Sequence, residues 1–118
     1  MNNEISWLVR VAVNAADVES FAILTREMVQ VCEAEPGTLI YERYVSDDGR
    51  HAHLFERYVD SDAALVHLHT FEERFSARFL ALVERQSAFV YGAPTAALRQ
   101  VLDRMNPNYF ARLDGFAH

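Results

Sequence analysis

The sequence contains no lysine: all 11 Lys or Arg positions among its 118 residues are arginines. A lysine amine is needed to form a Schiff base with a carbonyl substrate or with pyridoxal phosphate, so that class of enzyme chemistry is excluded for this chain. Cysteine is almost as scarce: Cys32 is the single thiol and cannot form an internal disulfide. This usage is typical of a reducing compartment, and we expect a cytoplasmic protein without thiol redox chemistry.

Long apolar runs and excess positive charge are also missing. No stretch approaches the roughly 20 apolar residues that cross a bilayer, and the first residues lack the basic segment and apolar run of a secretion signal. The formal net charge of −6 disfavours nucleic acids and anionic membranes as partners. We therefore expect a soluble protein that binds small molecules or other proteins.

Several catalytic motifs are absent as well. The sequence has no glycine-rich phosphate loop, no Gly-x-Ser-x-Gly, no Cys-x-x-Cys and no His-Glu-x-x-His. These absences argue against nucleotide-dependent and protease-like enzymes. A chain of this length is the size of one domain with one core.

The first half of the chain alternates between two kinds of periodicity. Apolar residues recur at every second position in residues 5–13 and then at helical spacing from Val18 to Cys32, where Glu35-Pro36-Gly37 ends the helix. Two aromatic, alternating segments, Thr38 to Ser46 and His51 to Asp60, flank an Asp-Asp-Gly turn and predict a β-hairpin.

The second half repeats the pattern of helix followed by strand. The predicted elements are a short helix capped by Ser61 that breaks near Thr70, a helix over Glu72 to Gln86, a strand over Ala88 to Gly92, a helix opening at Pro94-Thr95, and a fifth strand within Tyr109 to Phe116. The order strand, helix, strand, strand, helix, strand is the ferredoxin-like split βαβ arrangement, an α+β fold with an antiparallel sheet. Apolar residues on both sides of several strands predict that a second subunit covers the open sheet face, giving a homodimer.

Four stretches carry a resemblance to a known family: Trp7-Leu8-Val9-Arg10-Val11, residues 35–42 from Glu-Pro-Gly to Tyr-Glu, Leu54-Phe55-Glu56-Arg57-Tyr58, and Ser61-Asp62-Ala63-Ala64-Leu65 with His67-Leu68. By their order and spacing the chain resembles the antibiotic biosynthesis monooxygenases, and within them the quinol-oxidising, YgiN-like branch. The resemblance implies a dimeric α/β barrel in which residues 1–93 form the family domain. Residues 94–118 are then a helix and strand that extend the same domain.

The resemblance also implies a function, namely oxygenation of a quinol or polyketide-like phenol without metal, flavin or other cofactor. His67 matches the family histidine on the helix that lines the cavity, and histidine suits proton transfer because its ordinary pKa lies near neutral pH. We expect His67 to be the catalytic group. The residues expected to bind the substrate are Trp7, Tyr41, Tyr44, Tyr58, Phe71 and Phe75.

Other readings of the same residues stay open. The alternative function is a non-catalytic dimeric module that binds an apolar ligand, which a pocket filled by phenylalanines would favour. The resemblance also includes heme-degrading relatives, which carry an asparagine on the first strand and a tryptophan on a helix over the sheet. Heme degradation is disfavoured because this first strand has no asparagine and His67 stands where the tryptophan is expected. Heme binding is a third reading, since a histidine could ligate iron without that chemistry. His51 and His53 point to one face of a strand, but exposed strand histidines explain them better than a metal site does.

Two further residue types have structural interpretations. Cys32 lies on the apolar stripe of its helix and is interpreted as a small buried core residue. Glu42 and Glu56 are interpreted as partners of Arg43, Arg57 or Arg10 in cross-strand ion pairs rather than as acid-base catalysts.

Overall fold

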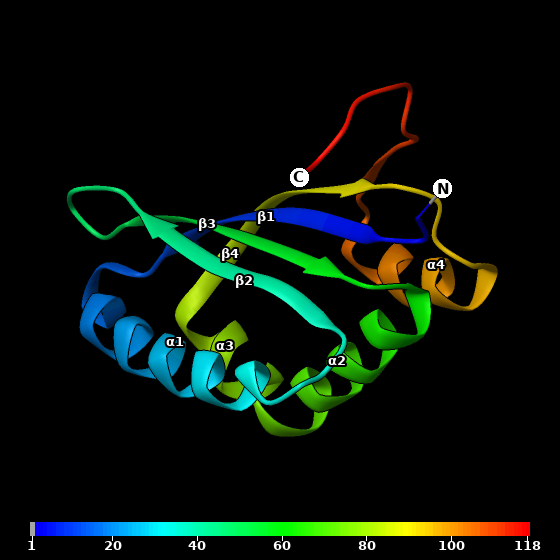
Figure 1. Ribbon diagram of the computed structural model, residues 1–118. Helices are drawn as coiled ribbons and strands as arrows, with labels where there is room; N and C mark the ends of the chain where they lie inside the picture. Colours follow the sequence, from blue (N-terminus) through cyan, green and yellow to red (C-terminus); the bar gives the residue numbers. More distant parts are fainter. Residues whose placement is uncertain (1) are drawn as a thin grey trace.

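A computed structural model describes residues 2–118 and shows a five-stranded sheet in the order β2-β3-β1-β4-β5. Helices α1 to α4 lie together on one face of this sheet, and the C-terminal arm, residues 111–118, lies on the other side (Figure 1). The elements are β1 (Ile5–Val13), α1 (Val18–Glu33), β2 (Thr38–Val45), β3 (His51–Tyr58), α2 (Ser61–Arg74), α3 (Ser76–Leu82), β4 (Val83–Tyr91), α4 (Ala96–Leu102) and β5 (Asn108–Phe110). Short 3-10 turns, Ala15–Asp17 and Asp103–Met105, precede α1 and follow α4.

The central strand β1 shows why the sequence folds in this way. Its odd-numbered residues, from Ile5 to Val13, are all buried against the helices, whereas its even-numbered residues face the other side of the sheet. Helix α1 buries the matching stripe of Phe21, Leu24, Met28 and Cys32. The apolar face of the strand, which repeats every two residues, therefore packs against the apolar face of the helix, which repeats every 3.6 residues, in one core.

The hairpin prediction is confirmed, because β2 and β3 pair in antiparallel fashion around Gly49, whose φ of 73° is the left-handed conformation that glycine adopts without strain. Strands β3 and β4 both pair with β1 in antiparallel fashion. This strand order confirms the predicted ferredoxin-like α+β fold.

The predicted helix boundaries were wrong between residues 61 and 86. Helix α2 continues past Thr70 to Arg74, and its N-terminal cap is Asp60, whose carboxylate accepts a hydrogen bond from the Ala63 amide at 2.8 Å. The following helix ends at Leu82 rather than at Gln86. Residues 83–86 instead extend β4, because Val83 pairs with Val13 of β1 and this pairing outweighs local helix propensity.

The C-terminal segment joins the same core. Thr95 caps α4 by accepting a hydrogen bond from the Leu98 amide at 3.3 Å, and both Leu98 and Leu102 are fully buried. The fifth strand is shorter than predicted for Tyr109 to Phe116, since β5 covers three residues that pair in parallel with the end of β4. None of the helices within residues 2–118 has the length and apolar character to cross a membrane.

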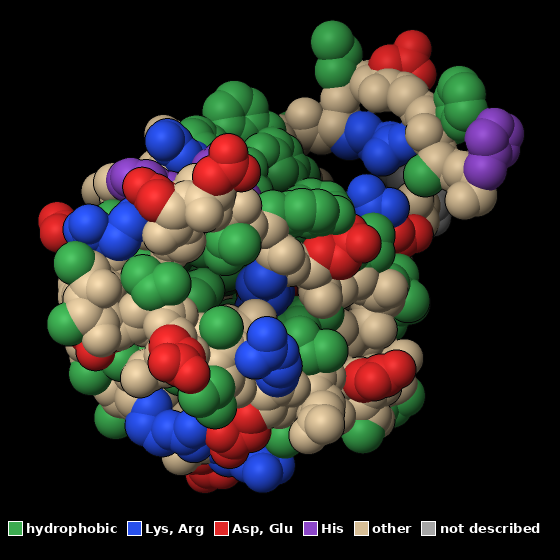
Figure 2. Space-filling view, turned by 90° about the vertical axis from the view of Figure 1, so that its left-hand side faces the viewer, with side chains coloured by type: hydrophobic (Ala, Val, Ile, Leu, Met, Phe, Trp, Pro, Cys, Tyr) green, Lys and Arg blue, Asp and Glu red, His purple; other side chains and the backbone are tan. Residues whose placement is uncertain are grey.

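The sheet face away from the helices is rich in large apolar side chains. Leu8 of β1 lies between Phe55 of β3 and Phe89 of β4, and all three are half-buried. Tyr91 and Phe110 beside them are 37% and 51% exposed. Hydrophobic side chains also gather along the top of the molecule in Figure 2, next to the C-terminal arm. We call the set Leu8, Phe55, Phe89, Tyr91 and Phe110 the outer apolar face.

Candidate functional site

The candidate site is centred on His67, a buried histidine in the middle of α2 with 3% of its surface exposed. Its Nδ1 atom lies 3.0 Å from Oε1 of Glu35, in the turn after α1. Its Nε2 atom lies 3.3 Å from Oε1 of Glu56 on β3. Each ring nitrogen therefore faces a carboxylate, and both nitrogens act as donors when the ring is protonated.

This environment decides the charge of the ring. Burial opposes a positive charge on His67, but hydrogen bonds with Cys32, Glu35 and Glu56 more than offset burial and raise its pKa to about 11. Burial also opposes the charge of Glu35, yet its hydrogen bond to His67 leaves the pKa of this carboxyl below its ordinary value. His67 is therefore an imidazolium at neutral pH, in contrast to the near-neutral pKa expected from the sequence.

The Glu56 carboxylate contacts three side chains of the site, those of Arg43, Tyr58 and His67. Burial would raise the pKa of this carboxyl, but the Arg43 charge and the hydrogen bond to His67 hold the pKa well below its usual range. The Arg43 guanidinium donates to Glu56 at 2.8 Å and the Tyr58 hydroxyl donates at 2.6 Å. The Arg43–Glu56 pair confirms the cross-strand ion pair interpreted from the sequence, and it is almost completely buried.

Tyr41, like Glu35, has unused hydrogen-bonding capacity at this site. Its ring lies under the Arg43 guanidinium, 3.4 Å from the ring centroid, and 5.4 Å from the His67 ring. Its hydroxyl is buried without a hydrogen-bond partner in the described structure. Burial and the nearby Glu56 charge raise the pKa of Tyr41, so the hydroxyl stays neutral and can donate to a ligand.

These polar groups face a small apolar cavity of about 50 Å³. The cavity is lined by Trp7, Val9, Met28, Tyr41, Arg43, Leu54, Glu56, His67, Leu68, Phe71, Phe79, Arg85 and Met105. A larger groove of about 470 Å³ lies beside it, bordered by α2, α3 and the end of α4. Leu68, Phe71, Arg85 and Met105 line both spaces and form the wall between them.

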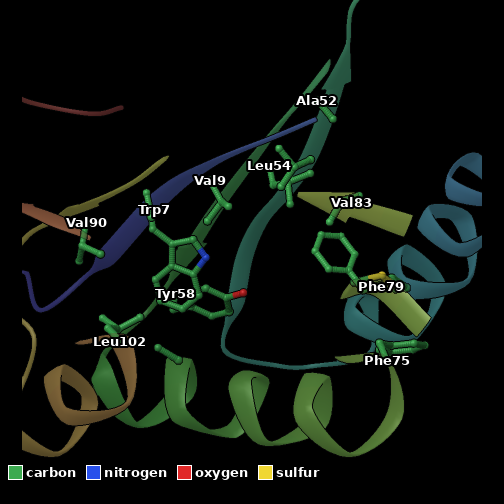
Figure 3. Packing of buried hydrophobic residues seen from close by; sticks show 14 of the residues in the cluster. Trp7, Val9, Ala52, Leu54, Tyr58, Phe75, Phe79, Val83, Val90 and Leu102 are labelled. Atoms are coloured by element: carbon green, nitrogen blue, oxygen red, sulfur yellow. The ribbon is translucent and has the colours of Figure 1, made fainter. Parts of the chain in front are cut away.

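The sequence-predicted residues separate into three groups. Trp7, Tyr41, His67 and Phe71 all line the cavity. Tyr58 lies directly behind it, with its ring 4.8 Å from Trp7 and 5.1 Å from His67. Figure 3 shows Trp7 and Tyr58 pointing from their strands toward α2.

Two predicted substrate-binding residues are placed elsewhere by the structure. Tyr44 is 58% exposed and pairs with His53 on the face of the sheet away from the helices, because side chains alternate along β2. Phe75 is 2% exposed and packs in the core at the α2–α3 junction, on the far side of Phe79 from Trp7 (Figure 3). Neither residue borders the cavity.

The sequence reasoning assigned Glu35 and Cys32 no part in this site. Residues three apart near the end of a helix lie on one side of it, and this spacing was the available signal. Among residues 2–118, Cys32, Glu35 and His67 form the group of metal-binding side chains whose donor atoms lie together, within 4.8 Å of one another. His51 and His53 are exposed and lie outside this group.

Gly37 allows the turn that carries Glu35 to pack closely against α2, which carries His67. A Cβ atom at this position would overlap the Cβ atom of Ala63 in the first turn of α2. The Gly37 carbonyl accepts a hydrogen bond from the Val59 amide at 2.9 Å, which holds the turn against the end of β3. Glycine therefore permits the close approach that brings His67 within reach of Glu35.

Comparison with known proteins gives matches in structure only. No protein-family model matches the sequence, and no curated protein is significantly similar to it. MupZ from Pseudomonas fluorescens is 25% identical, with a TM-score of 0.89 over 100% of this chain and 91% of MupZ. Rv0793 from Mycobacterium tuberculosis is 24% identical, with a TM-score of 0.67 over 80% of this chain and 98% of its own.

A third solved structure connects the fold to a family description. A protein from Nitrosomonas europaea, provisionally named an antibiotic biosynthesis monooxygenase, is 22% identical, with a TM-score of 0.67 over 79% of this chain and 92% of its own. Identities at this level establish a shared fold, which can host different reactions. The chain therefore has the fold of the antibiotic biosynthesis monooxygenases, the family that its sequence motifs resemble.

Proposed function

We propose that this protein is a monooxygenase-like enzyme that oxidises a quinol or polyketide-like phenol without a cofactor. The observation that carries the proposal is the convergence of His67 and the unpaired Tyr41 hydroxyl on an apolar cavity. A few directed polar groups in an apolar pocket, including one with a strongly perturbed pKa, are typical of enzyme sites. Similarity in fold to proteins named antibiotic biosynthesis monooxygenases adds support.

The volumes indicate how such a substrate would lie. A cavity of about 50 Å³ cannot hold a polycyclic phenol, whereas the adjoining groove of about 470 Å³ is within the range of small-molecule sites. The aromatic body would occupy the groove, and the reacting ring would pass the shared wall of Leu68, Phe71, Arg85 and Met105. Met105 is an unbranched side chain that can change rotamer to admit it.

The charges suggest a sequence of steps. The Tyr41 hydroxyl orients the substrate oxygen, and the Arg43 and His67 charges favour ionisation of a phenol placed beside them, against the opposing effects of burial and the Glu56 charge. The phenol releases its proton to water in the adjoining groove, and the resulting phenolate can pass an electron to molecular oxygen. In an anthrone-type substrate, a CH2 group then becomes a carbonyl group, with one oxygen atom entering the product and the other leaving as water. His67 begins this sequence protonated and supplies a proton to the reduced oxygen.

One observation favours the second candidate function, a ligand-binding module without catalysis. Phe71 and Phe79 occupy the cavity wall with their rings 5.6 Å apart and leave little free volume. In this case the charged network would serve stability, and the groove would hold an apolar ligand. The two functions differ in whether oxygen is consumed.

Oxygen uptake by metal-stripped protein with a panel of quinols and anthrone-like phenols tests the proposal. We expect uptake that needs no added cofactor, falls at least about tenfold in Tyr41→Phe and His67→Gln, and is unchanged in Tyr44→Phe. Tyr44→Phe is the matched control because it removes the same hydroxyl from the exposed face. Ligand binding without uptake across the panel would assign the protein to the binding module.

The assembly is a separate proposal. We propose a homodimer in which the outer apolar face of one subunit packs against that of another, because a contiguous patch of this kind is costly to leave in water. Packing two sheets face to face would bury Leu8, Phe55 and Phe89 of both subunits. The candidate site lies on the opposite side of the sheet and is formed within one subunit.

A further inference from the structure

The buried group of Cys32, Glu35 and His67 has a use that the proposed reaction does not require. Sγ of Cys32 lies 3.6 Å from Nδ1 of His67, and the same nitrogen lies 3.0 Å from Oε1 of Glu35. All three donor atoms lie within 4.8 Å of one another. Cys32 and His67 are almost completely buried, and the Glu35 side chain is 12% exposed.

These separations are close to those of a metal site. Zinc lies about 2.3 Å from a thiolate sulfur and about 2.0–2.1 Å from a histidine nitrogen or carboxylate oxygen, so tetrahedral ligands are roughly 3.4–3.6 Å apart. Small side-chain rotations would bring Cys32, Glu35 and His67 to these spacings. The set of sulfur, nitrogen and oxygen donors favours a borderline-soft ion over magnesium or calcium.

The surroundings also match those of a metal-binding histidine. Such a histidine usually directs its other ring nitrogen at a carboxylate, which fixes the ring and strengthens the ligand. Here Nε2 of His67 lies 3.3 Å from Glu56, and Glu56 is itself held by Arg43 and Tyr58. Glu56 is therefore already placed to hold the His67 ring in a metal-binding orientation.

Two buried atoms without partners provide an independent indication. Oε2 of Glu35 and the hydroxyl of Tyr41 have no hydrogen-bond partner among the described residues, although both are removed from water. Leaving a buried polar atom unsatisfied is destabilising. A metal ion between Cys32, Glu35 and His67 would give the Glu35 carboxylate a second interaction, and an ion-bound water could satisfy Tyr41.

The local charge allows a divalent ion. Arg43 and protonated His67 balance Glu35 and Glu56, so the site is neutral without metal. With a divalent ion bound, Arg43 and the ion contribute three positive charges against Glu35, Glu56 and the Cys32 thiolate. Metal ligation by a thiolate and an imidazole nitrogen releases protons, so ion binding at these side chains should be pH-dependent.

We propose that Cys32, Glu35 and His67 form a binding site for a zinc-like divalent transition metal ion, with Glu56 positioning His67 from the outer shell. The three ligands leave one coordination position for water or another small ligand. Because the ion occupies Nδ1 of His67, bound metal and protonated His67 exclude each other. If the proposed oxygenation is correct, this last consequence predicts that zinc inhibits it.

Cobalt(II) titration of reduced, metal-stripped full-length protein tests the site without any substrate. We expect one cobalt per chain, with a thiolate-to-cobalt charge-transfer band and the visible bands of a tetrahedral ion, and displacement by one equivalent of zinc. Cys32→Ser should abolish the charge-transfer band. Glu35→Gln should weaken binding at least tenfold, and Glu56→Gln should weaken it by about 10- to 100-fold.

The exposed pair His51 and His53 supplies the matched control. Replacing both by alanine should leave the spectrum and affinity unchanged, and circular dichroism would show that each variant is folded. The proposal is overturned by absence of the charge-transfer band in the native chain, by its survival in Cys32→Ser, or by its loss in the His51/His53 variant. Since these spectra need no substrate, the metal site and the proposed oxygenation can fail separately.

Discussion

Nδ1 of His67 lies 3.0 Å from Oε1 of Glu35, and this contact joins the middle of α2 to the turn after α1 across 32 residues of sequence. The Glu35 oxygen also accepts a hydrogen bond from the Thr38 hydroxyl at 2.9 Å. Together with Glu56 on the other side of the ring, this contact makes His67 a buried cation. The stability and the chemistry of the site both depend on that charge.

Stability should fall as pH rises above neutral because of His67. Its folded-state pKa of about 11 exceeds the ordinary value of 6.5, so its stabilising contribution is complete below pH 6.5 and declines as pH rises toward 11. The slope from this one group is at most about 1.4 kcal/mol per pH unit. Urea unfolding between pH 6 and pH 9 measures it, and His67→Gln should remove the corresponding part of the slope. An unchanged slope in this variant would show that the native ring is not protonated.

Arg43→Met should lower the free energy of unfolding by about 3–5 kcal/mol, because it leaves the buried Glu56 carboxylate without its main cationic partner. The control is Arg78→Met, which breaks an ion pair with Glu27 at 2.6 Å whose side chains are 53% and 46% exposed. That solvent-exposed pair should contribute little to stability, so Arg78→Met should have a much smaller effect than Arg43→Met. Chemical denaturation of both variants gives the comparison, and equal losses would contradict the assigned role of burial.

Gly37→Ala should destabilise the protein by about 1–3 kcal/mol, because the new methyl group overlaps the Ala63 side chain and forces α2 away from β2. The same movement would separate His67 from Glu35. The double variant Gly37→Ala/Ala63→Gly restores the space, and we expect it to be more stable than the sum of the two single losses. Thermal unfolding of the three variants tests this, and simple additivity would argue against the contact.

Phe89→Arg should convert the proposed dimer to a monomer, because it places a charge at the centre of the outer apolar face. Val66→Arg is the control: Val66 is 61% exposed on α2, on the helical side of the sheet, and its replacement should leave the dimer intact. Sedimentation velocity measures the mass of each species. A monomeric native chain at micromolar concentration would refute the proposed interface.

The sequence by itself determined the order of elements and most of the fold. The period of two in residues 5–13, the helical stripe from Val18 to Cys32 and the turn at Gly49 are local patterns, and local patterns fix local structure. These signals were enough for the ferredoxin-like arrangement. The family resemblance of its motifs, rather than periodicity, pointed to Trp7, Tyr41, His67 and Phe71, which all line the cavity.

The tertiary structure alone decided the boundaries and the chemistry of the site. Residues 83–86 form a strand because β1 lies beside them, which no local pattern encodes. Tyr44 and Phe75 lie away from the cavity because strand alternation and the α2–α3 junction direct them elsewhere. The pKa of His67 depends on Glu35 and Glu56, which approach it through contacts between separate elements. A side chain's charge is set by its neighbours in space, and those neighbours exist only once the chain has folded.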